Sequence, residues 1–175
     1  TTPLHVACAN GNLSMIRLLM EHGANIDEED CEGDTPLFYA ILENRLEVVK
    51  QLLSYGANVN HVNKHQYTPL IVSIMEGCFS IASFLIQYGA DIHHVDKYGR
   101  NALFYSVSLG NVLLIKELIQ HGADLNHVDH FDLTCLSLIT EKDQEILKLF
   151  LSYAEQFHPE NKKKLYQLRL KSIFI

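Results

Sequence analysis

The sequence predicts an all-α repeat solenoid made of about five helix-turn-helix units. Two markers recur every 33 residues without an insertion. The first marker reads Thr-Pro-Leu at 2–4, 35–37 and 68–70, Asn-Ala-Leu at 101–103 and Thr-Cys-Leu at 134–136. The second is a Gly-Ala pair that begins at residues 23, 56, 89 and 122. Several markers that share one period of this length indicate stacked repeats, each of which buries its apolar face against its neighbours.

The first marker predicts the start of a short helix in each repeat. Threonine is suited to cap the helix, and proline fits the first helical position, where its missing N–H is not needed. In the second repeat this predicts a helix from Pro36 to Glu43. The position that ends this helix accepts a left-handed backbone, and in successive repeats it holds Gly11, Asn44, Gly77 and Gly110.

A second helix follows in each repeat, for example from Leu46 to Tyr55. Its apolar residues recur at spacings of three and four, which is typical of one buried face. We therefore expect Leu52 and its counterpart Leu85 to be buried. The glycine of each Gly-Ala pair is expected to end this helix with a positive φ, as at Gly56 and Gly89.

Composition excludes several classes of protein. The 175 residues are 47% hydrophobic and 20% charged, which supports one folded domain and argues against disorder. The net charge of −7 argues against a nucleic-acid binder. No apolar run approaches the roughly 18 residues of a membrane span, and no secretory signal is recognisable. The four cysteines form no CxxC pair, so we expect a reducing intracellular compartment, the cytoplasm first, with the nucleus left open.

The finger segment of the second repeat, Asp30-Cys31-Glu32-Gly33-Asp34-Thr35-Pro36-Leu37, resembles the ankyrin repeat family. The resemblance covers roughly residues 1–155 and implies an L-shaped unit of two antiparallel helices and a projecting β-hairpin finger. It divides an ankyrin domain at 1–156 into repeats at about 1–29, 30–62, 63–95, 96–128 and 129–156. The last repeat departs from the pattern at Cys135, Ile139 and Glu155, and we interpret it as a degenerate closing repeat.

The two ends of the chain differ from the regular repeat. The chain begins inside a repeat, so we expect it to be part of a longer protein. Residues 157–175 are predicted to form a basic amphipathic cap or linker helix that begins at Pro159 and carries Leu165, Leu168 and Phe174. This segment holds five of the 14 basic residues, Lys162, Lys163, Lys164, Arg169 and Lys171. Apart from this segment, which could lie on a membrane surface, we expect no membrane contact.

No enzyme or cofactor motif stands out. A nucleophile elbow, a phosphate-binding glycine loop and a zinc-protease His-Glu-x-x-His pattern are all missing from the sequence. His61, His94 and His127 share one repeat position, but adjacent repeats lie too far apart for three rings to ligate one zinc ion. We therefore interpret them as repeated, solvent-facing finger residues, and expect no metal, no cofactor and no catalysis.

The resemblance also implies where a partner binds. In ankyrin stacks partners usually meet the fingertips and the inner face of the first helices. Carried over position by position, the candidate partner-binding residues are Glu32, Asp34, Glu43, His65, Tyr67, Met75, Tyr98, Arg100, Leu109, Phe131 and Leu133. The set is acidic at its start and aromatic further along. Large apolar residues that folding does not need to bury are typical of a binding surface.

These observations predict a non-catalytic protein-interaction module inside a larger intracellular protein. Its partner would be a protein or peptide with basic and large apolar residues, and no nucleic acid is expected. Two alternatives stay open. One is an intramolecular structural spacer. The other is a substrate-recruitment module for an enzyme or ubiquitin-ligase domain elsewhere in the parent chain.

Overall fold

The computed structural model describes residues 1–172, so the predicted position of Phe174 on the last helix lies outside the described residues. The chain forms two compact units, unit 1 at Thr1–Asp96 and unit 2 at Lys97–Ile175. Each unit is built from the predicted helix pairs, and the all-α repeat fold is confirmed. No helix within residues 1–172 is both long enough and apolar enough to cross a membrane.

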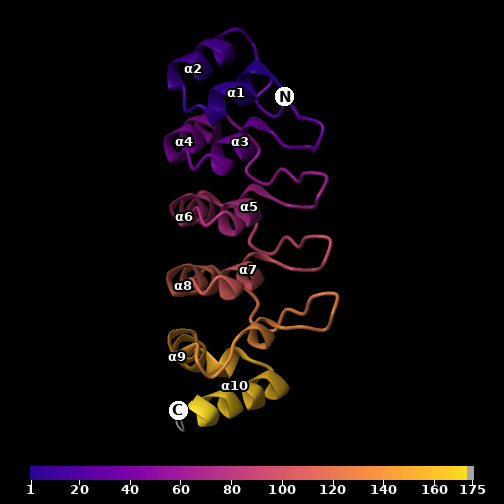
Figure 1. The fold of residues 1–175 in the computed structure, drawn as a ribbon, viewed down its shortest axis with the longest axis vertical. Helices are drawn as coiled ribbons and strands as arrows, with labels where there is room; N and C mark the ends of the chain where they lie inside the picture. Colours follow the sequence, from indigo (N-terminus) through magenta and orange to yellow (C-terminus); the bar gives the residue numbers. More distant parts are fainter. Residues whose placement is uncertain (173–175) are drawn as a thin grey trace. The chain divides into compact units, whose positions relative to one another are not determined.

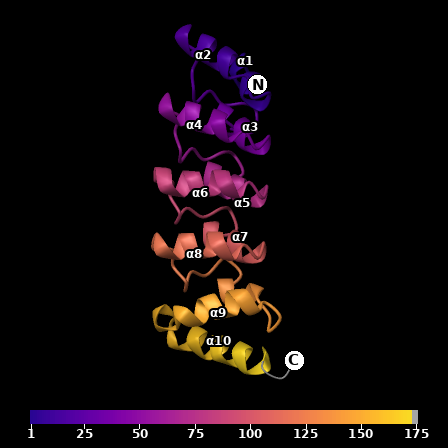
Figure 2. The same cartoon turned by 90° about the vertical axis from the view of Figure 1, so that its left-hand side faces the viewer.

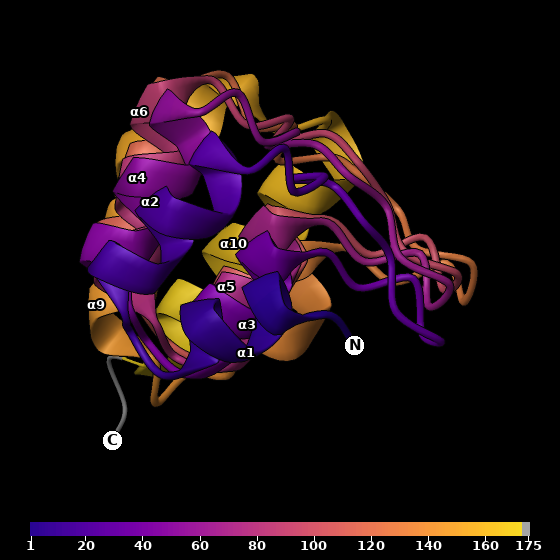
Figure 3. The same ribbon diagram turned by 90° about the horizontal axis from the view of Figure 1, so that it is seen from above.

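Unit 1 is a stack of three helix pairs (Figure 1). The pairs are α1 (Pro3–Ala9) with α2 (Leu13–Glu21), α3 (Pro36–Leu42) with α4 (Leu46–Ser54), and α5 (Pro69–Met75) with α6 (Phe79–Tyr88). Helix α3 contacts both α1 and α5, and α4 contacts α6. Seen from above, the first helices of unit 1 lie between the second helices and the projecting fingers (Figure 3). The first helices and the fingers therefore share one face of the unit.

The core of unit 1 follows the predicted pattern. Leu52 and Leu85 are fully buried, as expected from their repeat position. The helix ends are also confirmed: φ is 52° at Asn44, 90° at Gly56 and 97° at Gly89. These left-handed residues allow each helix to stop and the chain to turn back within a few residues.

The helix starts are less uniform than the sequence predicts. The Thr68 hydroxyl accepts a hydrogen bond from the Ile71 N–H at 3.3 Å, which is the expected cap. The buried Thr35 hydroxyl has no hydrogen-bond partner among the described residues and does not cap α3. The proline that follows Thr35 already removes one of the unpaired N–H groups of this helix start.

The predicted fingers are present as hydrogen-bonded turns with very little β-ladder. In the finger of the second repeat, the Asp30 carboxylate accepts hydrogen bonds from the N–H groups of Glu32 (2.8 Å) and Asp34 (2.9 Å). The Asp30 N–H donates to the Asp34 carbonyl at 3.0 Å, which closes the turn. Within residues 1–172 the β-pairing is a single antiparallel bridge between Val128 and Thr134. The Asp30 carboxylate accepts hydrogen bonds from backbone N–H groups that in a longer hairpin would bond to the opposite strand.

Unit 2 contains one regular pair and one shortened pair. The regular pair is α7 (Ala102–Ser108) and α8 (Val112–Gln120), and the shortened one is the 3-10 turn η1 (Cys135–Leu138) with α9 (Gln144–Ser152). A second 3-10 turn, η2 (Ala154–Gln156), leads into α10 (Pro159–Ser172).

The first helix of the last repeat is cut short at Ile139, which has extended backbone (φ −107°, ψ 153°) and a buried side chain. The last helix, α10, packs against α9 and η1 (Figure 2). Leu165 of α10 is fully buried, and the Lys164 ammonium donates to the Ser137 hydroxyl at 3.0 Å. The bounds of the individual repeats and of the segment 157–175 stay predictions.

Candidate partner-binding surfaces

A small hollow lies on the finger face of unit 1. Its volume is about 180 Å³, and it is lined by Asp34, Phe38, Leu42, Asn63, His65, Tyr67, Val72, Met75 and Glu76. Two fingers and the helices α3 and α5 contribute these residues. Four of the predicted site residues come together here, Asp34, His65, Tyr67 and Met75, whereas Glu32 and Glu43 lie outside the lining. We call this feature the unit 1 pocket.

Asn63 organises the finger side of the unit 1 pocket. Its buried amide oxygen accepts hydrogen bonds from the N–H groups of His65 and Tyr67, both at 3.0 Å. Its amide nitrogen donates to the Asp34 carboxylate at 2.7 Å. Because the oxygen faces two donors and the nitrogen faces an acceptor, the orientation of the amide is fixed. Asn63 thus joins two consecutive fingers at the pocket.

Asp34 is the half-buried acid of the unit 1 pocket. Burial raises the pKa of Asp34 above its ordinary value, and the negative charges of Asp30 and Glu32 add to this effect. The hydrogen bond from Asn63 and the nearby His65 act in the opposite direction but do not cancel it. A carboxylate in this position is incompletely compensated and favours an added positive charge.

Unit 2 presents an aromatic patch, which we define as Tyr98, Phe131 and Leu133. Tyr98 is 38% exposed and Phe131 is 59% exposed, and their ring centroids are 6.4 Å apart. Leu133 is exposed on the same finger as Phe131, and the predicted residue Leu109 is exposed at the end of α7. The patch thus brings together three of the predicted residues of this unit.

Arg100, also among the predicted residues, lies over the rings of Tyr98 and Phe131. Its guanidinium carbon is 5.5 Å from the Tyr98 ring centroid, 5.9 Å from that of Phe131 and 5.3 Å from that of Phe104. Its Nε donates to the Asp129 carboxylate at 3.3 Å. A cation above aromatic faces attracts each ring, so Arg100 fixes the positions of the two exposed rings.

Asp129 holds the finger that carries Phe131 and Leu133. Its carboxylate accepts hydrogen bonds from the N–H groups of Phe131 (2.9 Å) and Leu133 (3.0 Å). Burial alone would raise the pKa of Asp129. The two backbone hydrogen bonds and the Arg100 guanidinium outweigh burial and lower it.

A family model described as Ankyrin repeats (3 copies) matches the chain over residues 1–63, 30–96 and 59–129. The chain belongs to the ankyrin repeat family. Ankyrin repeats are generally protein–protein interaction modules, and the family is generally non-catalytic. A search of curated proteins found no match to this ankyrin chain.

The lowered pKa of Asp129 predicts an acid-sensitive ankyrin finger. A carboxyl whose folded-state pKa is lowered stabilises the fold above its unfolded pKa of about 3.9, and this stabilisation is lost as pH falls through the lower folded value. We therefore expect the chain to lose more stability between pH 7 and pH 3 than its Asp129→Asn variant does. Urea unfolding followed by circular dichroism, carried out at pH 7 and at pH 3, measures the stability lost by the parent chain and by the variant. Glu145→Gln, which removes a well-exposed carboxylate from α9, is the control and should behave like the parent chain. An unchanged pH dependence in Asp129→Asn would contradict this role.

The histidines of the ankyrin fingers differ from the expectation of solvent-facing residues. His61, His94 and His127 are half-buried, and each ring connects its finger to the preceding one. Their Nε2–H groups donate to the carbonyls of Gly33 (3.0 Å), Gln66 (3.0 Å) and Gly99 (2.6 Å), respectively. A carbonyl only accepts, so Nε2 must carry the proton in each case. Within residues 1–172, no group of three or more His, Cys, Asp or Glu side chains is arranged to hold a metal ion.

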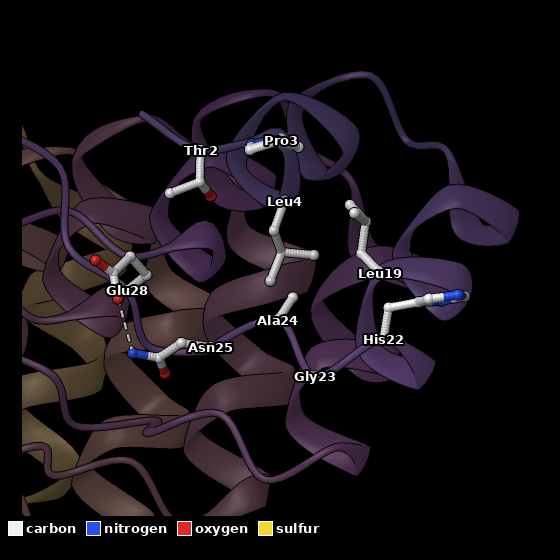
Figure 4. A pocket seen from close by; sticks show the side chains of 9 residues that line it. All are labelled: Thr2, Pro3, Leu4, Leu19, His22, Gly23, Ala24, Asn25 and Glu28. Carbon is white, nitrogen blue, oxygen red and sulfur yellow. Dashed lines mark hydrogen bonds between the residues drawn. The ribbon is translucent and has the colours of Figure 1, made fainter.

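A second hollow in unit 1 was not expected from the sequence (Figure 4). Its volume is about 350 Å³, and it lies where α1, the end of α2 and the following Gly23–Glu28 segment meet. Its polar side chains bond within the chain: the Asn25 amide donates to Glu28 at 2.8 Å, and the His22 ring donates to the Leu18 carbonyl at 2.8 Å. The repeat pattern gives no sign of this hollow, because Leu19 occupies the same position as Leu52 and Leu85; in the structure Leu19 is only half-buried, whereas these two counterparts are fully buried.

Proposed function

We propose that this ankyrin chain binds a partner protein or peptide through its fingers and the inner face of its first helices. The observation that carries the proposal is the aromatic patch of unit 2. Tyr98 and Phe131 remain exposed although they are the kind of side chain that dominates binding energy at interfaces. Arg100 holds both rings in place, so little conformational entropy is lost when a partner covers them.

Unit 1 presents acidic residues on its own surface. Residues 21–47 contain nine of the 21 acidic residues and one basic residue, Arg45. Glu32 and Asp34 lie on the finger of the second repeat, and Glu43 lies at the end of α3. Exposed charges such as Glu32 and Glu43 accelerate association with a basic partner and act less at high salt. The partner class is therefore a protein segment that carries basic residues together with large apolar side chains.

We also propose an intracellular location. All four cysteines are free thiols, and Cys31 is exposed on a finger. Free thiols of this kind persist in a reducing compartment. Burial raises the pKa of Cys8 and of Cys135 to about 12, which keeps both thiols protonated and unreactive.

The test uses partners selected by peptide display on the whole chain, with kinetics measured by biolayer interferometry. Tyr98→Ala and Phe131→Ala are each expected to weaken binding by about 30-fold or more, mainly through a faster off-rate, since truncating a central aromatic side chain removes about 2 kcal/mol or more. Tyr166→Ala, which truncates an exposed tyrosine on α10, is the matched control and should leave affinity unchanged.

Two results would overturn this assignment. One is unchanged affinity in both finger variants. The other is a loss of binding that is confined to outer-helix changes such as Lys50→Ala, Ser83→Ala or Lys116→Ala. A chain that selects no partner under conditions in which it is folded would favour the structural-spacer alternative.

A further inference from the structure

We propose that the unit 1 pocket receives the side chain of an arginine from the bound partner. This inference rests on the proposed function, because it names the residue that a partner inserts on the finger face of unit 1. The size of the pocket is the first reason. A volume of about 180 Å³ is well below the roughly 300–1,000 Å³ of sites for whole small molecules, so it suits one side chain.

The walls of the unit 1 pocket suit the aliphatic part of an arginine. Phe38 and Val72 are buried and form its apolar surface, while Leu42 and Met75 are exposed at its edge. Long basic side chains cover apolar surface with their methylene groups and keep the charged end near polar atoms. Met75 is unbranched and adapts its shape to the inserted chain.

The polar side of the unit 1 pocket supplies the recognition of charge. Asp34 uses one hydrogen bond from Asn63, and a carboxylate accepts about four, so it retains capacity for a guanidinium. Glu76 is a second, exposed carboxylate in the lining. Lys64, which follows Asn63 in the chain, donates to the Cys31 carbonyl at 2.7 Å. The pocket thus presents two carboxylates, one of them half-buried with a raised pKa.

The rings of His65 and Tyr67 favour arginine over lysine. They are stacked, with centroids 6.2 Å apart and planes at 29°, and both line the pocket. A planar guanidinium stacks on such rings and pairs with a carboxylate through two parallel hydrogen bonds, which an ammonium group does not do. His65 is itself held by the Glu32 carboxylate at 3.2 Å. The surface therefore matches the flat, forked end of arginine.

The experiment uses the whole chain labelled with ¹⁵N and three probes, the N-acetyl N′-methylamides of arginine, lysine and glutamine. Titration followed by NMR is expected to shift the backbone amides of Asp34, Asn63 and Tyr67 with the arginine probe. The lysine probe should bind several-fold more weakly, and the glutamine probe should give no saturable shift. Asp34→Asn should weaken the arginine probe about tenfold or more, since it removes a charge-assisted pair but keeps an oxygen for Asn63.

Controls make the outcome decisive. Glu47→Gln removes an exposed carboxylate from α4 and should leave binding unchanged. Glu76→Gln, which keeps the Asp34 network intact, should weaken the arginine probe by a smaller factor than Asp34→Asn. The amide spectrum of each variant reports whether it is folded. The inference is overturned if the arginine probe gives no saturable shift across the millimolar range or if its shifts fall outside the pocket. It is also overturned if the lysine probe binds with the same affinity as the arginine probe. The test involves no residue of the aromatic patch, so it can succeed or fail independently of the Tyr98 and Phe131 variants.

Discussion

Replacing Leu52 by alanine is expected to lower the free energy of unfolding by about 2–5 kcal/mol. Leu52 lies on α4 and is fully buried, so truncation removes apolar contacts and leaves a cavity that the surrounding helices only partly fill. In a repeat protein each unit is stabilised by its neighbours, so the loss reaches the adjacent helix pairs as well. Urea unfolding monitored by circular dichroism measures the difference.

Leu113→Ala provides the control for Leu52→Ala. Leu113 lies on α8 and is 81% exposed, so its truncation should change stability by no more than about 0.5 kcal/mol. Equal losses in the two variants would show that the buried face of the second helices has been assigned incorrectly.

Replacing Gly33 by valine is expected to destabilise the fold more than the same change at Gly89. Gly89 has a φ of 97° with open space around an added Cβ in the described part of the chain, so valine there meets backbone strain alone, about 1–3 kcal/mol. Gly33 has a φ of 79°, and its added Cβ would also lie 3.0 Å from the backbone nitrogen of Lys64. That nitrogen donates to the Glu32 carbonyl at 3.0 Å, so we expect valine to push the two fingers apart at this point and to weaken this hydrogen bond between them.

Thermal melting and amide exchange separate the two glycine variants. Gly89→Val should lower the melting temperature while the Lys64 amide stays protected. Gly33→Val should lower the melting temperature further and make the Lys64 amide exchange rapidly. Slow exchange of the Lys64 amide in Gly33→Val would show that its hydrogen bond to the Glu32 carbonyl survives, and it would contradict the prediction that valine separates the two fingers.

The helices were largely predictable from the sequence because their signals are local and recur. Proline at the first position defines the start of α1, α3 and α5, and a left-handed residue follows the end of each of these helices. The spacing of apolar residues defines the longer second helices. The predicted ends at Glu43 and Tyr55 are one residue beyond the observed ends at Leu42 and Ser54, which is the usual fraying of a helix terminus.

The candidate site was predictable only as a set of repeat positions. The sequence placed Asp34 and Tyr67 on a finger face, but it did not show that Asn63 joins them or that Phe38 closes the pocket. Nor did it show that Arg100 is held by Asp129. The Asn63–Asp34 and Arg100–Asp129 contacts each connect residues 29 positions apart, and they depend on side-chain geometry that periodicity does not encode.

The finger-to-finger histidine bonds have a consequence for protein engineering and for divergence among repeats. His61 lies in one finger, and the Gly33 carbonyl that accepts its Nε2–H lies in the preceding finger, 28 residues earlier. A fingertip loop transplanted on its own would therefore bring half of a bond and leave the other half behind. The smallest exchangeable cassette within unit 1 is a left-handed fingertip together with the histidine that follows it 28 residues later. Candidate binding residues such as Tyr67 can then be varied while each fingertip and its histidine are kept as a pair.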